Sequence, residues 1–206
     1  MNEWKEHTHY HRFPGYIPQQ FVIIFPRFTM KYSGKLTMNI RPESILVMGV
    51  SGSGKSHIGR LIAERLHADF IDADDHHSAT SIAKMSRGEP LNDGDREGWL
   101  QTLSGFYRDY QQHGKSLVIG CSALKHRYRD ILRQGAPALR ILYLHGEREV
   151  LLQRLKNRQG HFFQGDHMLD SQLHDLQPPS QDEATLLDIR LSPSEIIDQY
   201  LETLRV

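Results

Sequence analysis

Cysteine is almost absent from this chain of 206 residues, because Cys121 is the only one. A single cysteine excludes an internal disulfide framework and fits a reducing compartment, so we expect a cytoplasmic protein. An excess of charge of one sign is also absent, since 25 Lys and Arg residues balance 25 Asp and Glu residues. We therefore expect neither nucleic acid nor a membrane as a partner, although a local basic pocket is compatible with this balance.

The sequence also lacks an uninterrupted apolar stretch of bilayer length, and its apolar content of 38% suits a protein core. Residues 1–43 lack a clean helical or strand period and are rich in His, Pro and aromatic side chains. We expect a poorly ordered extension there rather than a signal peptide, because acidic and imidazole groups precede the short run FVIIF. Met38, just before the first expected core strand, offers an alternative start of translation.

From residue 44 onward, short apolar runs alternate with longer amphipathic segments. The expected strands are SILVMG (44–49), ADFIDAD (68–74), SLVIGCS (116–122), LRILYLHG (139–146) and ATLLDIRL (184–191). Residues 161–168 are expected to be irregular, before a helix over 169–177. The alternation predicts one α/β domain over 44–206, in which helices cover both faces of a five-stranded parallel sheet as a three-layer sandwich.

The stretch GVSGSGKS, between the first of these strands and the helix after it, matches the pattern G-x-x-x-x-G-K-[ST]. Its glycines let the backbone wrap closely around an anion, and the following helix adds the positive end of its dipole. Lys55 can reach the β- and γ-phosphates, and the Ser56 hydroxyl can ligate Mg²⁺. We predict an ATP site formed by Gly49, Val50, Ser51, Gly52, Ser53, Gly54, Lys55 and Ser56.

Two carboxylates end the second expected strand. Asp72 and Asp74 are two residues apart, so within a strand they would point the same way, at the edge of the sheet that carries the phosphate loop. The strand LVIGCS ends without an aspartate, so we assign the carboxylate on the Mg²⁺ side to Asp72. Asp74 is expected to orient the hydroxyl that accepts the phosphoryl group.

Arg154 and Arg158 are four residues apart, on one face of an expected helix. Such a pair is often only a solvated helix face. This helix, however, follows the fourth expected strand, where small-molecule P-loop kinases carry their lid. Arginines that close over a phosphoryl group stabilise the negative charge on its oxygens, and closure excludes water. We therefore predict a lid over about 154–167 in which both arginines act on the transferring group.

Five stretches together closely resemble the gluconokinase family of small P-loop kinases: VMGVSGSGKS, FIDADDHH, KMSRGEPLNDGDREGWL, CSALKHRYRDILR and RLKNRQGHFF. The resemblance spans nearly all of 44–206. It implies ATP-dependent phosphorylation of D-gluconate to 6-phosphogluconate with Mg²⁺, an adenylate-kinase-like fold with a small helical substrate lobe and a lid, and a homodimer. It also implies that Asp74 faces the sugar hydroxyl. Since gluconate carries a carboxylate, its pocket needs a cation; the candidate substrate contacts are His77, Arg96, Lys125 and Arg129.

The stretch HHSATS departs from the family pattern, because Ser78 and Ser81 stand where Pro and Asn are expected. We expect a less rigid loop and one lost amide contact, which affects substrate affinity and identity more than phosphoryl transfer. Three alternatives stay open: a kinase for another small hydroxy acid, such as shikimate or idonate; an ATPase switch that needs no acceptor; and a scaffold that does not bind ATP.

Overall fold

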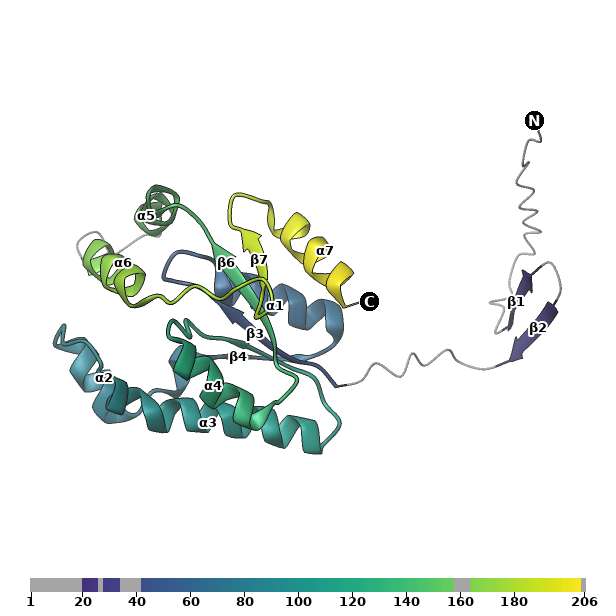
Figure 1. Ribbon diagram of the computed structural model, residues 1–206, viewed down its shortest axis with the longest axis horizontal. Coiled ribbons are helices and arrows are strands. Elements are labelled where there is room, and N and C mark those ends of the chain that lie inside the picture. The colour runs from purple at the N-terminus through teal and green to yellow at the C-terminus, as the bar shows by residue number, and fades with distance from the viewer. Residues whose placement is uncertain (1–19, 26–27, 34–41, 158–163, 205–206) are drawn as a thin grey trace. The chain divides into compact units, whose positions relative to one another are not determined.

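The computed structural model describes residues 20–25, 28–33, 42–157 and 164–204 (Figure 1). The chain divides into two compact units, Met1–Asn39 and Ile40–Val206. In the first unit, β1 (Gln20–Phe25) and β2 (Phe28–Ser33) pair antiparallel, a hairpin that the sequence analysis missed. Their β-branched and aromatic residues favour strands. The poor order expected of 1–43 falls mostly outside the described residues and stays a prediction, as does the start at Met38.

The second unit is built on the predicted five-stranded parallel sheet, with the strand order β4-β5-β3-β6-β7. The strands are β3 (Ser44–Met48), β4 (Asp69–Asp72), β5 (Leu117–Gly120), β6 (Arg140–His145) and β7 (Thr185–Asp188). Because β3 lies in the middle and is completely buried, its carboxyl end delivers the phosphate loop to the centre of one sheet edge.

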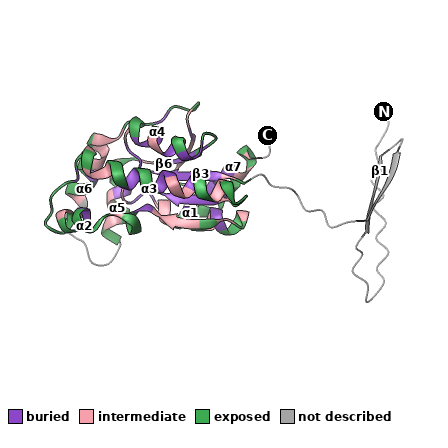
Figure 2. Cartoon of the chain, turned by 90° about the horizontal axis from the view of Figure 1, so that it is seen from below, coloured by how far each residue is buried: buried purple, intermediate pink, exposed green. Residues whose placement is uncertain are grey.

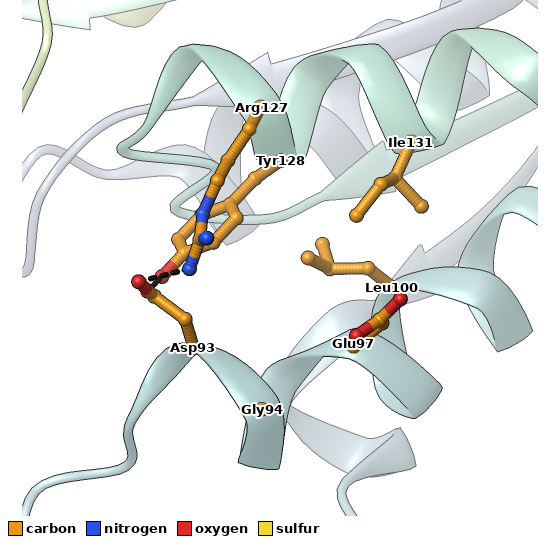
Figure 3. A pocket seen from close by; sticks show the side chains of 7 residues that line it. All are labelled: Asp93, Gly94, Glu97, Leu100, Arg127, Tyr128 and Ile131. Atoms are coloured by element: carbon orange, nitrogen blue, oxygen red, sulfur yellow. Dashed lines mark hydrogen bonds and ion pairs between the residues drawn. The ribbon is translucent and has the colours of Figure 1, made fainter.

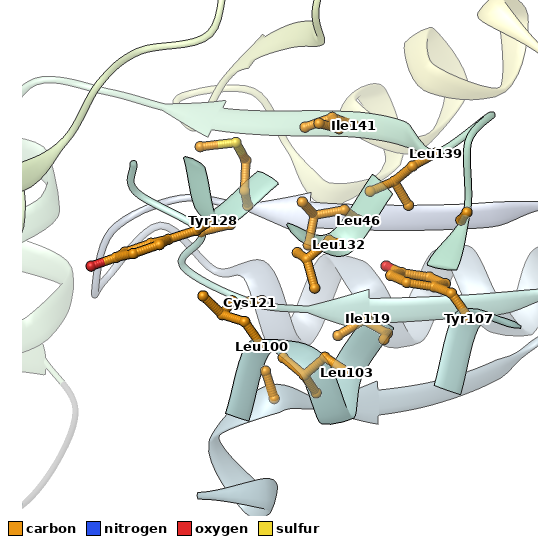
Figure 4. Close-up of a cluster of buried hydrophobic side chains, with 14 of the residues drawn as sticks. Leu46, Leu100, Leu103, Tyr107, Ile119, Cys121, Tyr128, Leu132, Leu139 and Ile141 are labelled. Atoms are coloured by element: carbon orange, nitrogen blue, oxygen red, sulfur yellow. The ribbon is translucent and has the colours of Figure 1, made fainter. Parts of the chain in front are cut away.

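Helices cover both faces of this sheet, which confirms the three-layer sandwich (Figures 1 and 2). The helices are α1 (Lys55–Leu66), α2 (Ala79–Ser86), α3 (Asp93–Gln112), α4 (His126–Gly135), α5 (Arg148–Asn157), α6 (Gln164–Asp175) and α7 (Pro193–Thr203), with a 3₁₀ turn η1 (Ala73–His76). Side chains of β3 alternate between the faces: Ile45 and Val47 pack with α1 and α7, whereas Leu46 and Met48 pack with α3 and α4. Figure 4 shows the buried cluster on the α3 and α4 side of the sheet, which contains Leu46.

The helix ends follow the sequence closely, with one exception. Asn92 caps α3 in a capping box with Asp95, and Pro193 opens α7. The exception is α6, which begins at Gln164, so the prediction of irregular structure was wrong for 164–168. Gly165 and a run of polar residues weaken the helical pattern there, but the buried Leu169 packs α6 into the core, and such packing supplies most helix stability.

Candidate active site

The phosphate loop joins β3 to α1 in a conformation that requires glycine. Gly52 and Gly54 have φ angles of 85° and 90°, and Gly54 is the N-cap of α1. A Cβ atom on Gly52 would come within 2.8 Å of the Leu151 carbonyl oxygen, so space as well as backbone angle excludes a side chain. The loop is therefore formed by the predicted strand–loop–helix arrangement, with the amino end of α1 as its last turn.

Two side chains from beyond the fourth core strand contact or approach this loop. The Ser51 N–H donates to Gln172 Oε1 of α6 at 2.6 Å. The Arg154 guanidinium lies 3.9 Å from where a Cβ on Gly54 would be, and it donates to the Ile189 carbonyl oxygen at 2.5 Å. Arg154 of the predicted lid pair thus lies beside the phosphate loop, whereas Arg158 lies outside the described residues.

The two strand-end carboxylates take different backbone positions. Asp72 is the last residue of β4, but Asp74 lies in η1 and is exposed. The expectation that both project from one strand was therefore wrong, because the chain turns after Asp72. Asp72 Oδ1 accepts a 3.3 Å hydrogen bond from the Asp74 N–H, which caps this turn.

The thiol of Cys121 is buried just beyond the end of β5, at the edge of the sheet that carries the phosphate loop. The pKa of this thiol is raised to about 12, chiefly by burial; the carboxylates of Asp74 and Asp72 also raise it, while a hydrogen bond with the Ala123 backbone and the charge of Lys55 lower it. Lys55 and both aspartates are therefore near enough to act on the charge of Cys121.

Ser56 and Asp72 both flank Gly120, at the end of β5. Asp72 is the register partner of Gly120 in the sheet, and the Ser56 Cα lies 3.8 Å from where a Cβ on Gly120 would be. A hydroxyl and a carboxylate in this position are the hard oxygen ligands that Mg²⁺ takes when it is also bound to phosphates. Among the described residues, no group of three or more His, Cys, Asp or Glu side chains could hold a metal by itself.

His77 lies on the acceptor side of the site. Its ring stacks on Trp99 with centroids 4.3 Å apart, and the indole Nε1 donates to the Ala73 carbonyl oxygen at 2.8 Å. His77 Nδ1 is buried and has no hydrogen-bond partner within the described part of the chain. Burial lowers the pKa of His77; Asp74 raises it, and Arg96 lowers it further. Asp74 and Arg96 therefore act on the charge of His77, whose ring is held by its stack on Trp99.

The predicted cations differ in what already binds them. Arg96 donates to the Leu91 carbonyl oxygen, and it forms no ion pair with any residue in the described ranges. Lys125 is already paired, with Asp93 at 3.0 Å and with Asp175 at 3.8 Å. Of these two cations, Arg96 is therefore the better candidate to bind a substrate carboxylate.

Arg129 is completely buried, and each nitrogen of its guanidinium has a partner within the protein. Two parallel hydrogen bonds of 2.7 and 3.0 Å join it to Glu183. This arrangement gives no support to a substrate contact for Arg129, which sequence reasoning could not separate from an exposed helix cation.

Figure 3 shows a separate pocket of about 170 Å³ between α3 and α4. Asp93, at the start of α3, accepts hydrogen bonds or ion pairs there from Tyr128, Arg127 and Lys125. These contacts fix the start of α4 against α3, and they explain why Lys125 turns toward α3.

The stretch HHSATS supplies a helix cap. Ser78 is the N-cap of α2: its Oγ accepts a 3.1 Å bond from the Ser81 N–H and donates to Ser81 Oγ at 3.0 Å. The expected loss of rigidity is therefore offset by hydrogen bonds between the two serines. The effect on substrate affinity stays a prediction.

Sequence reasoning did not identify Gln172 as a site residue. It lies 121 positions from Ser51, and no local pattern indicates that its amide contacts the phosphate loop. Trp99 was not identified either, yet it stacks on His77 and binds the carbonyl oxygen of Ala73, the residue before Asp74. No helix among the described residues is long and apolar enough to cross a membrane.

Comparisons with known proteins agree with this geometry. The family model described as shikimate kinase matches residues 51–205. The thermoresistant gluconokinase of Escherichia coli (strain K12) is 47% identical over 166 residues, which cover 81% of this chain and 91% of that protein. The gluconokinase of Gluconobacter oxydans (strain 621H) is 36% identical and covers 81% of this chain and 92% of that protein.

Among solved structures, a gluconokinase from Sinorhizobium meliloti 1021 superposes with a TM-score of 0.71 at 40% identity, covering 80% of this chain and 92% of that one. An APS kinase from Mycobacterium tuberculosis, at 18% identity and a TM-score of 0.61, shares the fold and covers 81% of this chain and 99% of that one. Because these gluconokinases are similar to the chain over most of its length, the chain belongs to the gluconokinase family; it also matches the broader shikimate kinase family model.

Proposed function

We propose that this protein transfers the γ-phosphoryl group of ATP to D-gluconate, giving 6-phosphogluconate and ADP. The observation that carries the proposal is the meeting of two half-sites at one edge of the sheet. The phosphate loop with Lys55 follows β3 and the turn with Asp74 follows β4, at the same edge of the parallel sheet, and Asp74 and Arg96 both act on the charge of His77. A polyhydroxy acid offers the partners that these last three side chains need: hydroxyl groups and one carboxylate.

The donor half of the site binds the triphosphate. Backbone N–H groups of the phosphate loop other than those of Ser51 and Ser53, together with the amino end of α1, hold the phosphate oxygens, and Lys55 adds a point charge toward the β- and γ-phosphates. Ser56 and Asp72 would hold Mg²⁺, which would neutralise charge on the phosphates. Arg154, and Arg158 with it, stabilise the charge that spreads over the transferring group.

The acceptor half orients the sugar acid. Asp74 accepts the hydrogen bond of the attacking hydroxyl and can take its proton as the bond to phosphorus forms. Arg96 binds the carboxylate, because a guanidinium offers two parallel N–H donors to it. His77, kept neutral by burial, offers a donor or an acceptor to a hydroxyl. Lys125, neutralised by Asp93, is a secondary contact at most.

We further propose a cytoplasmic homodimer. The support for the compartment is the single buried cysteine, Cys121, and the support for the dimer is the family resemblance. Light scattering on the purified protein, with a mass near 48 kDa for a dimer of 23.8 kDa chains (2 × 23.8), tests the assembly.

The sharpest test of the acceptor half compares two neighbouring aspartates. Asp74 and Asp75 both lie in η1 and are both exposed, but only Asp74 is assigned to the hydroxyl. Asp74→Asn should lower gluconate-dependent ADP release by about 10²-fold or more, whereas Asp75→Asn should leave it within about twofold. Equal loss in both variants, or in neither, would remove Asp74 from this role.

A further inference from the structure

Arg129 is the largest completely buried side chain in the described part of the chain, and it lies next to the site without entering it. Burying a guanidinium is costly unless its charge is paired and its N–H groups are bonded. Here Glu183 supplies the charge: the hydrogen bond from Arg129, with a further one from Arg133, holds the pKa of Glu183 at about 2, although burial acts to raise it. Nε and Nη2 of Arg129 bind Glu183, and the third guanidinium nitrogen has other partners.

That nitrogen, Nη1, holds three backbone carbonyl oxygens together. It donates to Ala123 at 3.2 Å, to Leu124 at 3.3 Å and to Gln177 at 3.1 Å. The first two belong to the segment that follows β5, and the third belongs to the segment that follows α6. Two more hydrogen bonds join Gln177 to this part of the chain. The Gln177 N–H donates to the Leu124 carbonyl oxygen at 2.9 Å, and Gln177 Oε1 accepts from the N–H of His126, the first residue of α4, at 2.7 Å.

The segment held in this way, Cys121–Leu124, has a strained backbone. Ala123 has a φ of 43°, and it is one of two residues other than glycine with a positive φ in the described ranges. An alanine in this region costs about 1 kcal/mol, so the surrounding contacts must enforce it. The second such residue, His67, simply ends α1, where a left-handed residue is common.

The same segment forms part of the active-site floor. Cys121 directly follows Gly120, the register partner of Asp72, and Cys121 and Ala123 pack in the cluster that contains Trp99 and Ala73. A shift of this backbone would therefore move the support beneath the acceptor half of the site. The other side of the contact leads to α6, whose Gln172 binds the phosphate loop.

We propose that Arg129 is a positioning residue for the acceptor half of the site: with Glu183 it holds Cys121–Leu124 in its strained conformation and ties it to the segment after α6. The inference rests on the proposed function, since its readout is gluconate binding. Because Arg129 is buried and all its guanidinium nitrogens are bonded within the protein, this role depends on its three carbonyl contacts and involves no contact with either substrate.

The test must separate position from stability, because removing one partner of a buried ion pair destabilises strongly. The double variant Arg129→Met with Glu183→Met removes both charges and keeps apolar volume, a change that is often tolerated. It should fold with a cooperative thermal transition, raise the KM for D-gluconate about tenfold, and leave the KM for ATP within about twofold. Arg129→Lys, which keeps the charge but loses the forked donors, should shift the same KM in the same direction.

Arg133→Met is the matched control. Arg133 also binds Glu183, at 2.9 Å, but it donates to none of the three carbonyls. It should lower stability and leave the KM for D-gluconate unchanged. The inference fails if folded Arg129→Lys and the double variant keep the gluconate KM of the unmodified protein, or if Arg133→Met raises it equally. The proposed function fails separately, if the unmodified protein shows no gluconate-dependent turnover.

Discussion

The imidazole of His77 lies flat against the indole of Trp99, with ring planes 17° apart and centroids at 4.3 Å. This stack places a titratable ring on a fluorophore, next to Asp74 and Arg96. The stack holds the His77 ring in place, and the fluorescence of Trp99 can therefore be used to follow the protonation of His77.

The first prediction concerns the charge of His77. Burial lowers its pKa below 6.5, so between that folded-state value and 6.5 the unfolded chain binds a proton that the folded chain does not. Stability should therefore fall as pH drops below about 6.5. In a Trp4→Phe background, Trp99 emission should be quenched with a midpoint below 6.5, because a protonated imidazole quenches a stacked indole.

Neighbouring charges should move this midpoint in opposite directions. Asp74→Asn removes a group that raises the pKa of His77, so the midpoint should fall; Arg96→Gln removes a group that lowers it, so the midpoint should rise. A midpoint that neither variant changes would show that Asp74 and Arg96 do not act on the charge of His77.

The second prediction concerns the phosphate loop. Gly52→Ala should weaken ATP binding at least about tenfold, because its Cβ would meet the Leu151 carbonyl at 2.8 Å and its φ of 85° strains alanine. Gly98→Ala is the control: it lies exposed in α3 with no atom within 4 Å of the added carbon, and it should stabilise by up to about 1 kcal/mol. Calorimetric titration with ATP separates the two.

The third prediction concerns Ser78. Ser78→Ala removes the cap of α2 and should cost about 1 kcal/mol in the free energy of unfolding, measured with urea. Ser78→Pro restores the residue that the family resemblance led us to expect. It should be tolerated, because φ is −63° at Ser78 and the preceding His77 is extended. A proline variant less stable than the alanine variant would contradict this account of the loop.

The fourth prediction concerns Arg154. Arg154→Met should lower kcat by about 10²-fold or more with a small change in the KM for ATP, since its charge acts mainly on the transferring group. Arg148→Met, on the same helix but paired with Asp170 at 2.6 Å, should leave kcat unchanged. Equal effects on kcat would assign Arg154 to structure alone.

Local patterns were sufficient to predict most of the fold. The core strands are continuous apolar runs, and the phosphate loop carries its glycines, lysine and serine in one short stretch, so both could be recognised without tertiary information. The turn after Asp72 could not be predicted in this way, because carboxylates two residues apart are compatible with both a strand and a 3₁₀ turn.

The remaining features depend on residues far apart in the chain. Arg129 looks like any helix cation until Glu183, 54 positions later, meets it in the core. Gln172 likewise reaches the phosphate loop only through the packing of α6. Such contacts leave no periodic pattern, and sequence reasoning therefore assigned Arg129 to the substrate and did not assign Gln172 at all.

The most direct test of the central claim is the rate of ADP release with Mg-ATP and each of D-gluconate, L-idonate, shikimate or no acceptor. The account predicts turnover that depends on D-gluconate, with kcat/KM at least about 10²-fold above that for shikimate, and product phosphate on the primary hydroxyl by ³¹P NMR. Equal ADP release with and without every acceptor would contradict it.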